Sequence, residues 1–213
     1  PATLEKELDE AVKQLDQIND SYNSIAPQVI GASIHEGAEL AIVTNFNIIT
    51  PFRRWFCDGM ANYLTARCLE KFVSKDAAKS FLQSFDASNF IDYKDQIDLM
   101  HWRSEEWEEN SPVQMDKELD NIAYVFATDE ICKLIERHKP EVVPAIFTEI
   151  AKTQLPDEDT IFDAIQKVTK EDFRKVLAKY GSKAPKDNLS RLAIKSIVLD
   201  SSGSAPTDDK SKQ

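Results

Sequence analysis

The sequence predicts an all-α protein with little or no β-sheet. Only five of its 213 residues are glycine, and Leu, Ala, Lys and Glu, which have high helix propensity, occur throughout. Apolar residues recur three and four positions apart, as Leu4, Leu8 and Val12 do, which is the spacing of one helix face. No segment shows the apolar and polar alternation that is typical of a half-buried strand. We therefore expect helices along most of the chain.

Apolar periodicity and capping residues place the boundaries of these helices. Pro51 suits the first turn of a helix, where its missing N–H leaves no hydrogen bond unmade. Ser74 and Asp157 stand where two further helices begin. Thr169, followed three residues later by Asp172, matches a capping box. The expected helices span residues 4–18, 26–43, 51–72, 75–85, 115–138, 141–154, 159–168, 169–180 and 188–199, with loops at 44–50 and 86–112.

The helices are expected to form a single domain over residues 1–199. Its parts are a motif-bearing core at residues 26–73 and a helical C-terminal part at residues 113–199. Residues 200–213 are rich in Ser, Asp and Lys and contain too few apolar side chains to pack, so a disordered tail is expected there.

The charge of the chain limits its partners. With 37 acidic and 26 basic residues the formal net charge is −11, which repels phosphate backbones and argues against nucleic acid as a partner. No apolar run approaches the roughly 20 residues that span a bilayer, so we expect no membrane span. The compartment stays open, because a removed export signal would leave no trace in the sequence. The oligomeric state stays open as well.

His35, Glu36 and Glu39 stand in the middle of the otherwise apolar helix expected at residues 26–43. Residues four apart on a helix differ by about 40° around its axis, so His35 and Glu39 project from one face and can share a metal ion. In zinc peptidases with the pattern His-Glu-x-x-His, both histidines bind zinc and the glutamate polarises the attacking water. Here Glu39 takes the place of the second histidine.

A second motif lies downstream, in the segment 55–63, which reads W-F-C-D-G-M-A-N-Y. It closely resembles the W-x-x-E-G-x-A-x-Y helix of the gluzincin metallopeptidases, in which the glutamate is the third zinc ligand. Between Glu39 and Asp58 there are 18 residues, the spacing of the alanyl-aminopeptidase-like and glycyl-aminopeptidase-like families. A fainter similarity extends over residues 28–180, and residues 35–63 are its diagnostic part.

The resemblance implies a gluzincin-like helical fold and a zinc site formed by His35, Glu39 and Asp58. It also implies that Glu36 is the general base and that a peptide or protein is the substrate or partner. Tyr124 falls where these families keep a tyrosine that stabilises the oxyanion, although a tyrosine on an apolar helix face is also a common core residue.

The sequence departs from the family at two of the three ligands. One imidazole with two carboxylates is a harder and more anionic set than two imidazoles with one carboxylate, so it would bind zinc less selectively and leave it a weaker Lewis acid. Asp58 is also one methylene shorter than glutamate, which withdraws its oxygen by about 1.5 Å. Either the two helices sit closer together than in the family, or the site is broken. The β-sheet that gluzincins place before the motif has no expected counterpart in the 34 residues before His35.

Other polar residues near the motif have simpler expected roles. His101 could supply a ligand or an acid, but a position on a surface loop is expected. Arg53 and Arg54 are expected to pair with carboxylates, which are numerous in this chain. Asn62, one turn beyond Asp58, could orient that carboxylate or make an unrelated polar contact.

Three interpretations of the motif follow. The one we favour is a degenerate gluzincin relative, non-hydrolytic or weakly active, that acts as a binding or structural module with or without zinc. The second is an active metal-dependent peptidase with an unusual His/Glu/Asp site, because Glu36 is present and both altered positions still offer an oxygen ligand. The third is an unrelated helical interaction protein in which the motif is a coincidence.

Overall fold

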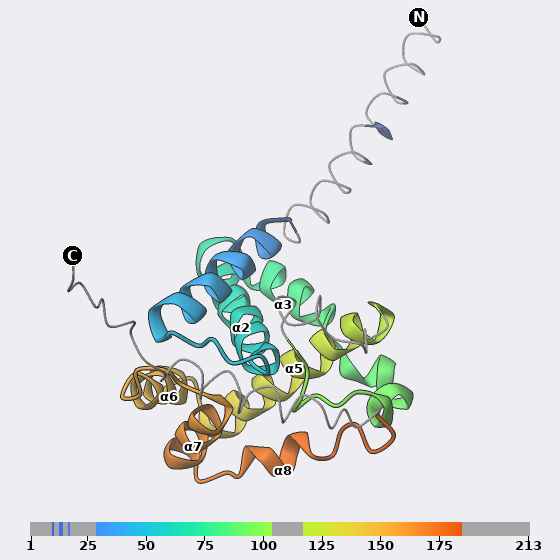
Figure 1. Cartoon of the computed structure of the whole chain (residues 1–213). Helices are drawn as coiled ribbons and strands as arrows, with labels where there is room; N and C mark the ends of the chain where they lie inside the picture. Colours follow the sequence, from blue (N-terminus) through green and yellow to red (C-terminus); the bar gives the residue numbers. More distant parts are fainter. Residues whose placement is uncertain (1–9, 11–12, 15–16, 18–28, 104–116, 185–213) are drawn as a thin grey trace, which may run out of the picture.

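The computed structural model describes residues 10, 13–14, 17, 29–103 and 117–184, and these contain helices and no strand (Figure 1). The predicted all-α fold is confirmed. No helix in the described ranges is long and apolar enough to cross a membrane. A helix over residues 29–46 is followed by α2 (Arg54–Phe72), α3 (Lys75–Gln83), the 3₁₀ helix η1 (Ala87–Gln96), α5 (Lys117–His138), α6 (Val142–Ile150), α7 (Glu158–Thr169) and α8 (Phe173–Leu177).

Helix α2 is the central element of the fold, and most of its residues are buried. It packs against α5 (Figure 1), and the part of α2 from Arg54 to Asn62 makes the polar contacts with that helix. Gly59 permits this packing, because a Cβ atom there would lie 2.7 Å from Ile131 Cγ1 and 2.9 Å from the carbonyl oxygen of Ala127. The backbones of α2 and α5 therefore come close together beside Asp58.

An aromatic cluster joins the C-terminal helices to α2. Trp55 is 1% exposed and stacks on Phe162 of α7 with the ring centroids 4.8 Å apart. It also contacts Phe173 at the start of α8. Buried aromatic side chains of this size contribute strongly to core stability.

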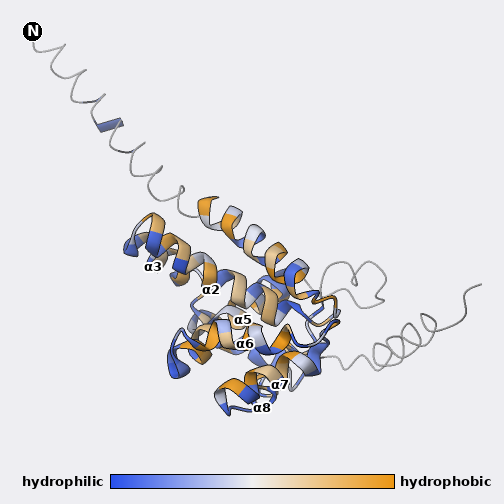
Figure 2. Ribbon diagram, turned by 90° about the vertical axis from the view of Figure 1, so that its left-hand side faces the viewer, coloured by the Kyte–Doolittle hydropathy of each residue, from blue (hydrophilic) through white to orange (hydrophobic). Residues whose placement is uncertain are grey.

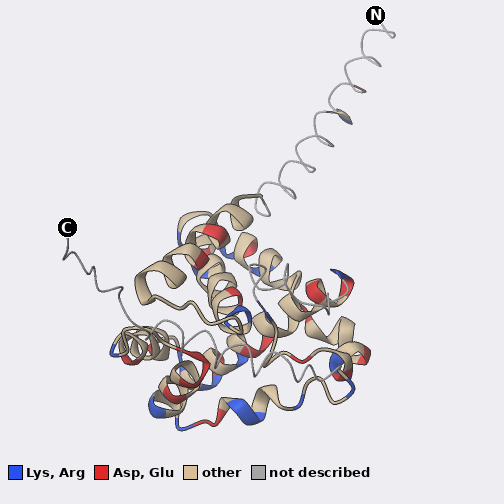
Figure 3. Ribbon diagram, viewed as in Figure 1, with Lys and Arg blue, Asp and Glu red and all other residues tan. Residues whose placement is uncertain are grey.

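The outer helices α3 and α7 have one apolar face each (Figure 2). Acidic and basic residues are interspersed along the described helices (Figure 3).

The helix of residues 29–46 lies against α2 and α3. Near its start, Gly31 allows contact with α3, since a Cβ atom there would lie 2.8 Å from the Phe81 ring. Near its end, Ile42 is buried in the main core. Its face that carries His35 and Glu39 is directed at α2. The packing of these two helices brings together the two halves of the sequence motif.

Several predicted boundaries are confirmed and others are wrong. Ser74 and Asp157 are N-caps whose side chains accept hydrogen bonds from Ala77 N and Thr160 N. Pro51, however, lies in a turn, and α2 begins only at Arg54.

The predicted capping box at Thr169 and Asp172 is also wrong. Thr169 is the last residue of α7, and its hydroxyl donates to the carbonyl of Ile165. Asp172 precedes α8 without a side-chain cap. The reason is Lys170, whose left-handed backbone (φ 65°) ends α7 and separates the two helices.

The segment predicted as a loop at residues 86–112 contains the helix η1, which sequence periodicity did not reveal. Asp86 starts it by accepting a hydrogen bond from Ser88 N. A short 3₁₀ helix gives little periodic signal, because its turns are tighter than those of an α-helix. The predicted helix at 188–199 and the predicted tail at 200–213 lie outside the described residues, as does most of the predicted helix at 4–18.

Candidate metal centre

The structure brings together the three predicted ligands, His35, Glu39 and Asp58. His35 Nε2 lies 3.6 Å from Asp58 Oδ1 and 4.0 Å from Glu39 Oε2. One ligand atom from each of the three residues lies within 4.8 Å of the others. His35 and Asp58 are buried and Glu39 is half-buried. This His/Glu/Asp group could hold a divalent cation.

The ligand atoms of the group, which lie within 4.8 Å of one another, are farther apart than those of a closed zinc site. Ligand atoms about 2.0–2.1 Å from a tetrahedral zinc ion are about 3.3 Å from one another. The helix of residues 29–46 lies close enough to α2 for the shorter side chain of Asp58 to face His35.

The two oxygens of Asp58 have different surroundings. Oδ2 lies 3.4 Å from Arg54 Nε, whereas Oδ1 is buried and has no hydrogen-bond partner among the described residues. Leaving a buried charged acceptor unpaired costs about 1–3 kcal/mol or more. A cation beside His35 Nε2 would satisfy Oδ1. His35 Nδ1 is likewise buried without a partner, although most metal-binding histidines donate from their second nitrogen.

A ladder of polar side chains runs along the contact between α2 and α5 and supports Asp58. Arg54 Nη1 donates to Asp120 Oδ1 at 2.8 Å, and Asn62 Nδ2 donates to Thr128 Oγ1 at 2.7 Å. Tyr124 lies between these two pairs, one helical turn from each. The members of the ladder are Arg54, Asp58 and Asn62 on α2, and Asp120, Tyr124 and Thr128 on α5. Both sets are four residues apart, which is why they meet in register.

Arg54 is held from several sides. Its guanidinium lies 4.2 Å from the centroid of the Trp102 ring and 4.8 Å from that of Tyr124. Trp102 Nε1 donates to the same Asp120 oxygen at 2.7 Å. The expectation that Arg54 pairs with carboxylates is confirmed, and one of these carboxylates is the candidate ligand Asp58.

The charges around His35 favour a proton on the metal-free site. Burial lowers the pKa of His35, but the interaction with Asp58 and the charges of Glu39 and Glu36 outweigh it, so the pKa lies above its usual value. Burial raises the pKa of Glu39, and the charge of Asp58 raises it further. A cation at this place would therefore displace protons as it binds.

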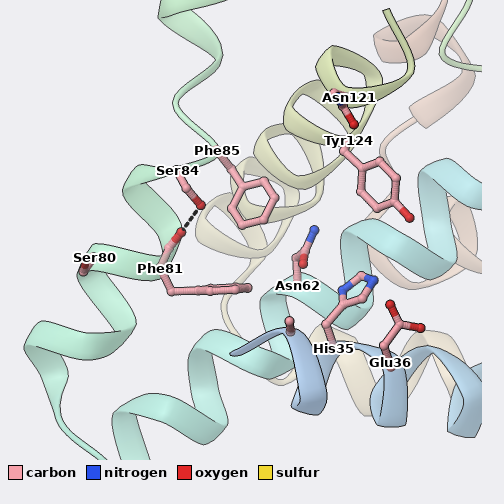
Figure 4. A pocket seen from close by; sticks show the side chains of 10 residues that line it. His35, Glu36, Asn62, Ser80, Phe81, Ser84, Phe85, Asn121 and Tyr124 are labelled. Carbon is pink, nitrogen blue, oxygen red and sulfur yellow. Dashed lines mark hydrogen bonds between the residues drawn. The ribbon is translucent and has the colours of Figure 1, made fainter. Parts of the chain in front are cut away.

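Glu36 and Tyr124, the predicted general base and oxyanion-stabilising residue, line one pocket together with His35 (Figure 4). Glu36 is exposed and Tyr124 half-buried. The rings of Tyr124 and His35 are 6.2 Å apart between centroids. Burial raises the pKa of Tyr124, as does the charge of Asp58, against the opposing effect of Arg54. The Tyr124 hydroxyl is therefore protonated at neutral pH and able to donate a hydrogen bond.

Two other residues lie outside the site or differ from their suggested role. His101 is half-buried, and its Nδ1 lies 2.7 Å from Asp98 Oδ2, with its ring against Phe52. It is not part of the His/Glu/Asp group. Asn62 bonds to Thr128 rather than to Asp58.

Sequence reasoning missed Trp102 and Asp120, which hold Arg54. The one available signal was the repeat of Asp120, Tyr124 and Thr128 at four-residue intervals on a helix, matching Arg54 and Asp58 on the other motif helix. The resemblance placed Tyr124 at the site, but it did not indicate that Asp120 and Thr128 face Arg54 and Asn62.

No family model, curated protein or solved structure matches this chain. The case for its function therefore depends on its own residues and their geometry.

Proposed function

We propose that this protein is metallopeptidase-like, of the gluzincin type, and binds a divalent cation, with zinc as the first candidate, through His35, Glu39 and Asp58. It acts as a peptide- or protein-binding module with little or no hydrolytic activity. One observation carries the proposal: the buried Asp58 Oδ1, which accepts no hydrogen bond from the described residues, faces His35 Nε2 at 3.6 Å, beside Glu39.

The donor set supports weak rather than strong catalysis. Two carboxylates bring more negative charge to a cation than one, which lowers its ability to polarise a bound group. Oxygen-rich sets also suit magnesium and manganese, so selectivity for zinc is reduced. Arg54 withdraws part of the charge of Asp58, since its guanidinium shares the Oδ2 side of that carboxylate.

Metal content of the purified full chain tests the proposal. Elemental analysis should find about one equivalent of a divalent ion after zinc is added and the excess removed, and His35→Ala should lose it. His138→Ala is a matched control, because His138 pairs with Glu171 away from the site. Glu39→His should tighten zinc binding, since it restores the second imidazole. Absence of stoichiometric metal in the wild type and in Glu39→His alike would refute the proposal.

Hydrolysis is the second candidate function, and one observation favours it. Glu36, Tyr124 and His35 line the same pocket (Figure 4). A divalent cation, when bound, supplies Lewis acidity at this end of the pocket. In a hydrolase the Glu36 carboxylate would accept a proton from water, and the Tyr124 hydroxyl would donate a hydrogen bond to the carbonyl oxygen that gains negative charge.

A quenched-fluorescent peptide library tests this second function. If the chain is a peptidase, zinc-loaded wild type cleaves, Glu36→Gln loses at least about a hundredfold in rate, and Glu39→His gains. Glu136→Gln, a change of the same kind at an exposed position of α5, should have wild-type activity. Cleavage that survives in Glu36→Gln would exclude Glu36 as the base.

A further inference from the structure

We infer that the pocket beside the candidate metal centre binds an apolar side chain of a peptide, of the size of leucine or phenylalanine, whose backbone N–H donates to Asn62. The inference rests on the proposed function, because His35, one of the three candidate metal ligands, lines the same pocket. It adds the chemical class of the ligand.

The pocket has a volume of about 490 Å³ and is lined by residues of four helices: the helix of residues 29–46, α2, α3 and α5 (Figure 4). This is within the range of about 300–1,000 Å³ that is typical of ligand pockets. His35 and Glu36 line one end, and Ala32, Phe81 and Phe85 form an apolar wall. Figure 4 shows Asn62 between the phenylalanine rings and His35. An extended ligand would therefore contact apolar side chains and His35, the candidate metal ligand that lines the pocket, at the same time.

The apolar wall is fixed in place by packing. The rings of Phe81 and Phe85 meet at 63° with their centroids 5.2 Å apart. Gly31 lies directly against the Phe81 ring and leaves no room for it to turn toward the helix of residues 29–46. Because both rings line an open pocket, an apolar group that enters displaces water from apolar surface, which is favourable.

Asn62 supplies the polar contact, and its amide orientation follows from the hydrogen bonds around it. The Thr128 hydroxyl donates to the carbonyl of Tyr124 at 2.9 Å, so Thr128 Oγ1 must accept from Asn62, which identifies the donor as Nδ2. The Oδ1 atom of Asn62 then has no partner among the described residues. Asn62 is 3% exposed and lines the pocket. A nearly buried acceptor that opens to a pocket requires a donor from the ligand.

These two features together select a peptide. A hydrocarbon chain would suit Phe81 and Phe85 but has no donor for Asn62. A small polar molecule would suit Asn62 and leave the rings in water. A peptide offers a backbone N–H and a side chain within one residue, and its carbonyl would lie toward His35 and Glu36.

Hydroxamates bound to the zinc-loaded full chain provide the first test. Acetohydroxamic acid and 3-phenylpropanohydroxamic acid chelate a metal through the same group, but only the second has a ring for the pocket. Isothermal titration should show the phenyl compound binding at least about tenfold tighter, as expected for burial of one aromatic side chain. Ala32→Leu, an exposed helix position that lines the pocket, should reduce this preference to less than about threefold. Ser33→Leu, the next position and not a lining residue, should keep it.

A second measurement needs no metal and separates failure of this inference from failure of the metal site. N-acetyl-phenylalanine methylamide is titrated into metal-free, ¹⁵N-labelled protein. Two analogues are titrated separately for comparison: the alanine analogue, and an ester in which oxygen replaces the N–H that donates to Asn62. The phenylalanine amide should shift the Asn62 side-chain amide signal and bind at least about tenfold tighter than either analogue.

Each outcome has a distinct meaning. Equal binding of the two hydroxamates to zinc-loaded protein would overturn the pocket inference and leave the metal centre intact. If the wild type holds no zinc, the proposed function fails, and the metal-free titration then decides the pocket inference alone. Equal binding of the phenylalanine and alanine amides in that titration would overturn it.

Discussion

His35 Nε2 and Asp58 Oδ1 face each other at 3.6 Å, and Asp58 Oδ1 accepts no hydrogen bond in the described part of the chain. The two residues come from different helices and are 23 positions apart in sequence. Packing of the helix of residues 29–46 on α2 brings them together, and Arg54 of the polar ladder contacts the other oxygen of Asp58.

Removal of Arg54 should destabilise the protein strongly. Arg54 is 3% exposed and pairs with Asp120 and Asp58, so Arg54→Met leaves the buried Asp58 and the half-buried Asp120 without their cation. Breaking a buried pair in this way costs about 3–5 kcal/mol. Urea denaturation of metal-free protein measures the loss. Arg67→Met, which removes the exposed pair of Arg67 with Glu70, should cost at most about 1 kcal/mol. Similar losses in the two variants would contradict the role given to Arg54.

Alanine should have opposite effects at two helical glycines. Gly59→Ala places a methyl group against Ile131 and the Ala127 carbonyl, so it should destabilise by about 1–3 kcal/mol. Gly37→Ala meets nothing within 4 Å and should stabilise by about 0.5–1 kcal/mol, because alanine has the higher helix propensity. Thermal and urea unfolding measure both. A neutral Gly59→Ala would mean that α2 and α5 are not in close contact beside Asp58.

The free energy of unfolding should decrease as Glu158 ionises. Burial raises the pKa of Glu158 to about 7, against the opposing charge of His101, and its Oε1 is buried without a partner. A folded-state pKa above the unfolded value means that the stabilisation is present below about pH 4.5 and is lost as the pH rises through about 7. Glu158→Gln should therefore be more stable than wild type by about 1 kcal/mol or more at pH 8, and not at pH 4.5. The exposed Glu136→Gln should show no such difference.

Zinc binding should weaken as the pH falls. The pKa values of His35 and Glu39 are both raised in the metal-free protein, so protons compete with the cation at two of its three ligands. The same shifts mean that the metal-free protein loses stability as the pH rises through these pKa values. Competition with a chromophoric chelator should show the affinity falling at least about tenfold between about pH 8 and about pH 6. A pH-independent affinity would place the metal elsewhere.

The sequence predicted the helical fold and the three residues of the candidate site. It did not predict the contacts between helices that bring these residues together. The i to i+4 spacing placed His35 and Glu39 on one face, because a helix fixes that geometry locally. Whether the shorter Asp58 could reach them depended on the distance between two helices, which is a tertiary property. Trp102 and Asp120 were missed for the same reason, since the surroundings of Arg54 come from segments 49 and 66 residues away.

Local rules also failed where two signals competed. Thr169 and Asp172 have the spacing of a capping box, but the same threonine fits the end of α7, where its hydroxyl bonds to Ile165. Pro51 suits the first turn of a helix and also a turn that precedes a helix. The structure has the second arrangement, in which the neighbouring Phe52 is packed and only 6% exposed. In both cases a sequence motif allowed two structures.

X-ray absorption at the zinc edge of the zinc-loaded full chain tests the central claim most directly. His35, Glu39 and Asp58 predict one imidazole and two or three oxygen donors at about 2.0–2.2 Å, with no sulfur. The imidazole signal should disappear in His35→Ala and double in Glu39→His. A sulfur shell at about 2.3 Å, or a spectrum unchanged by both substitutions, would show that the cation binds elsewhere and contradict the account.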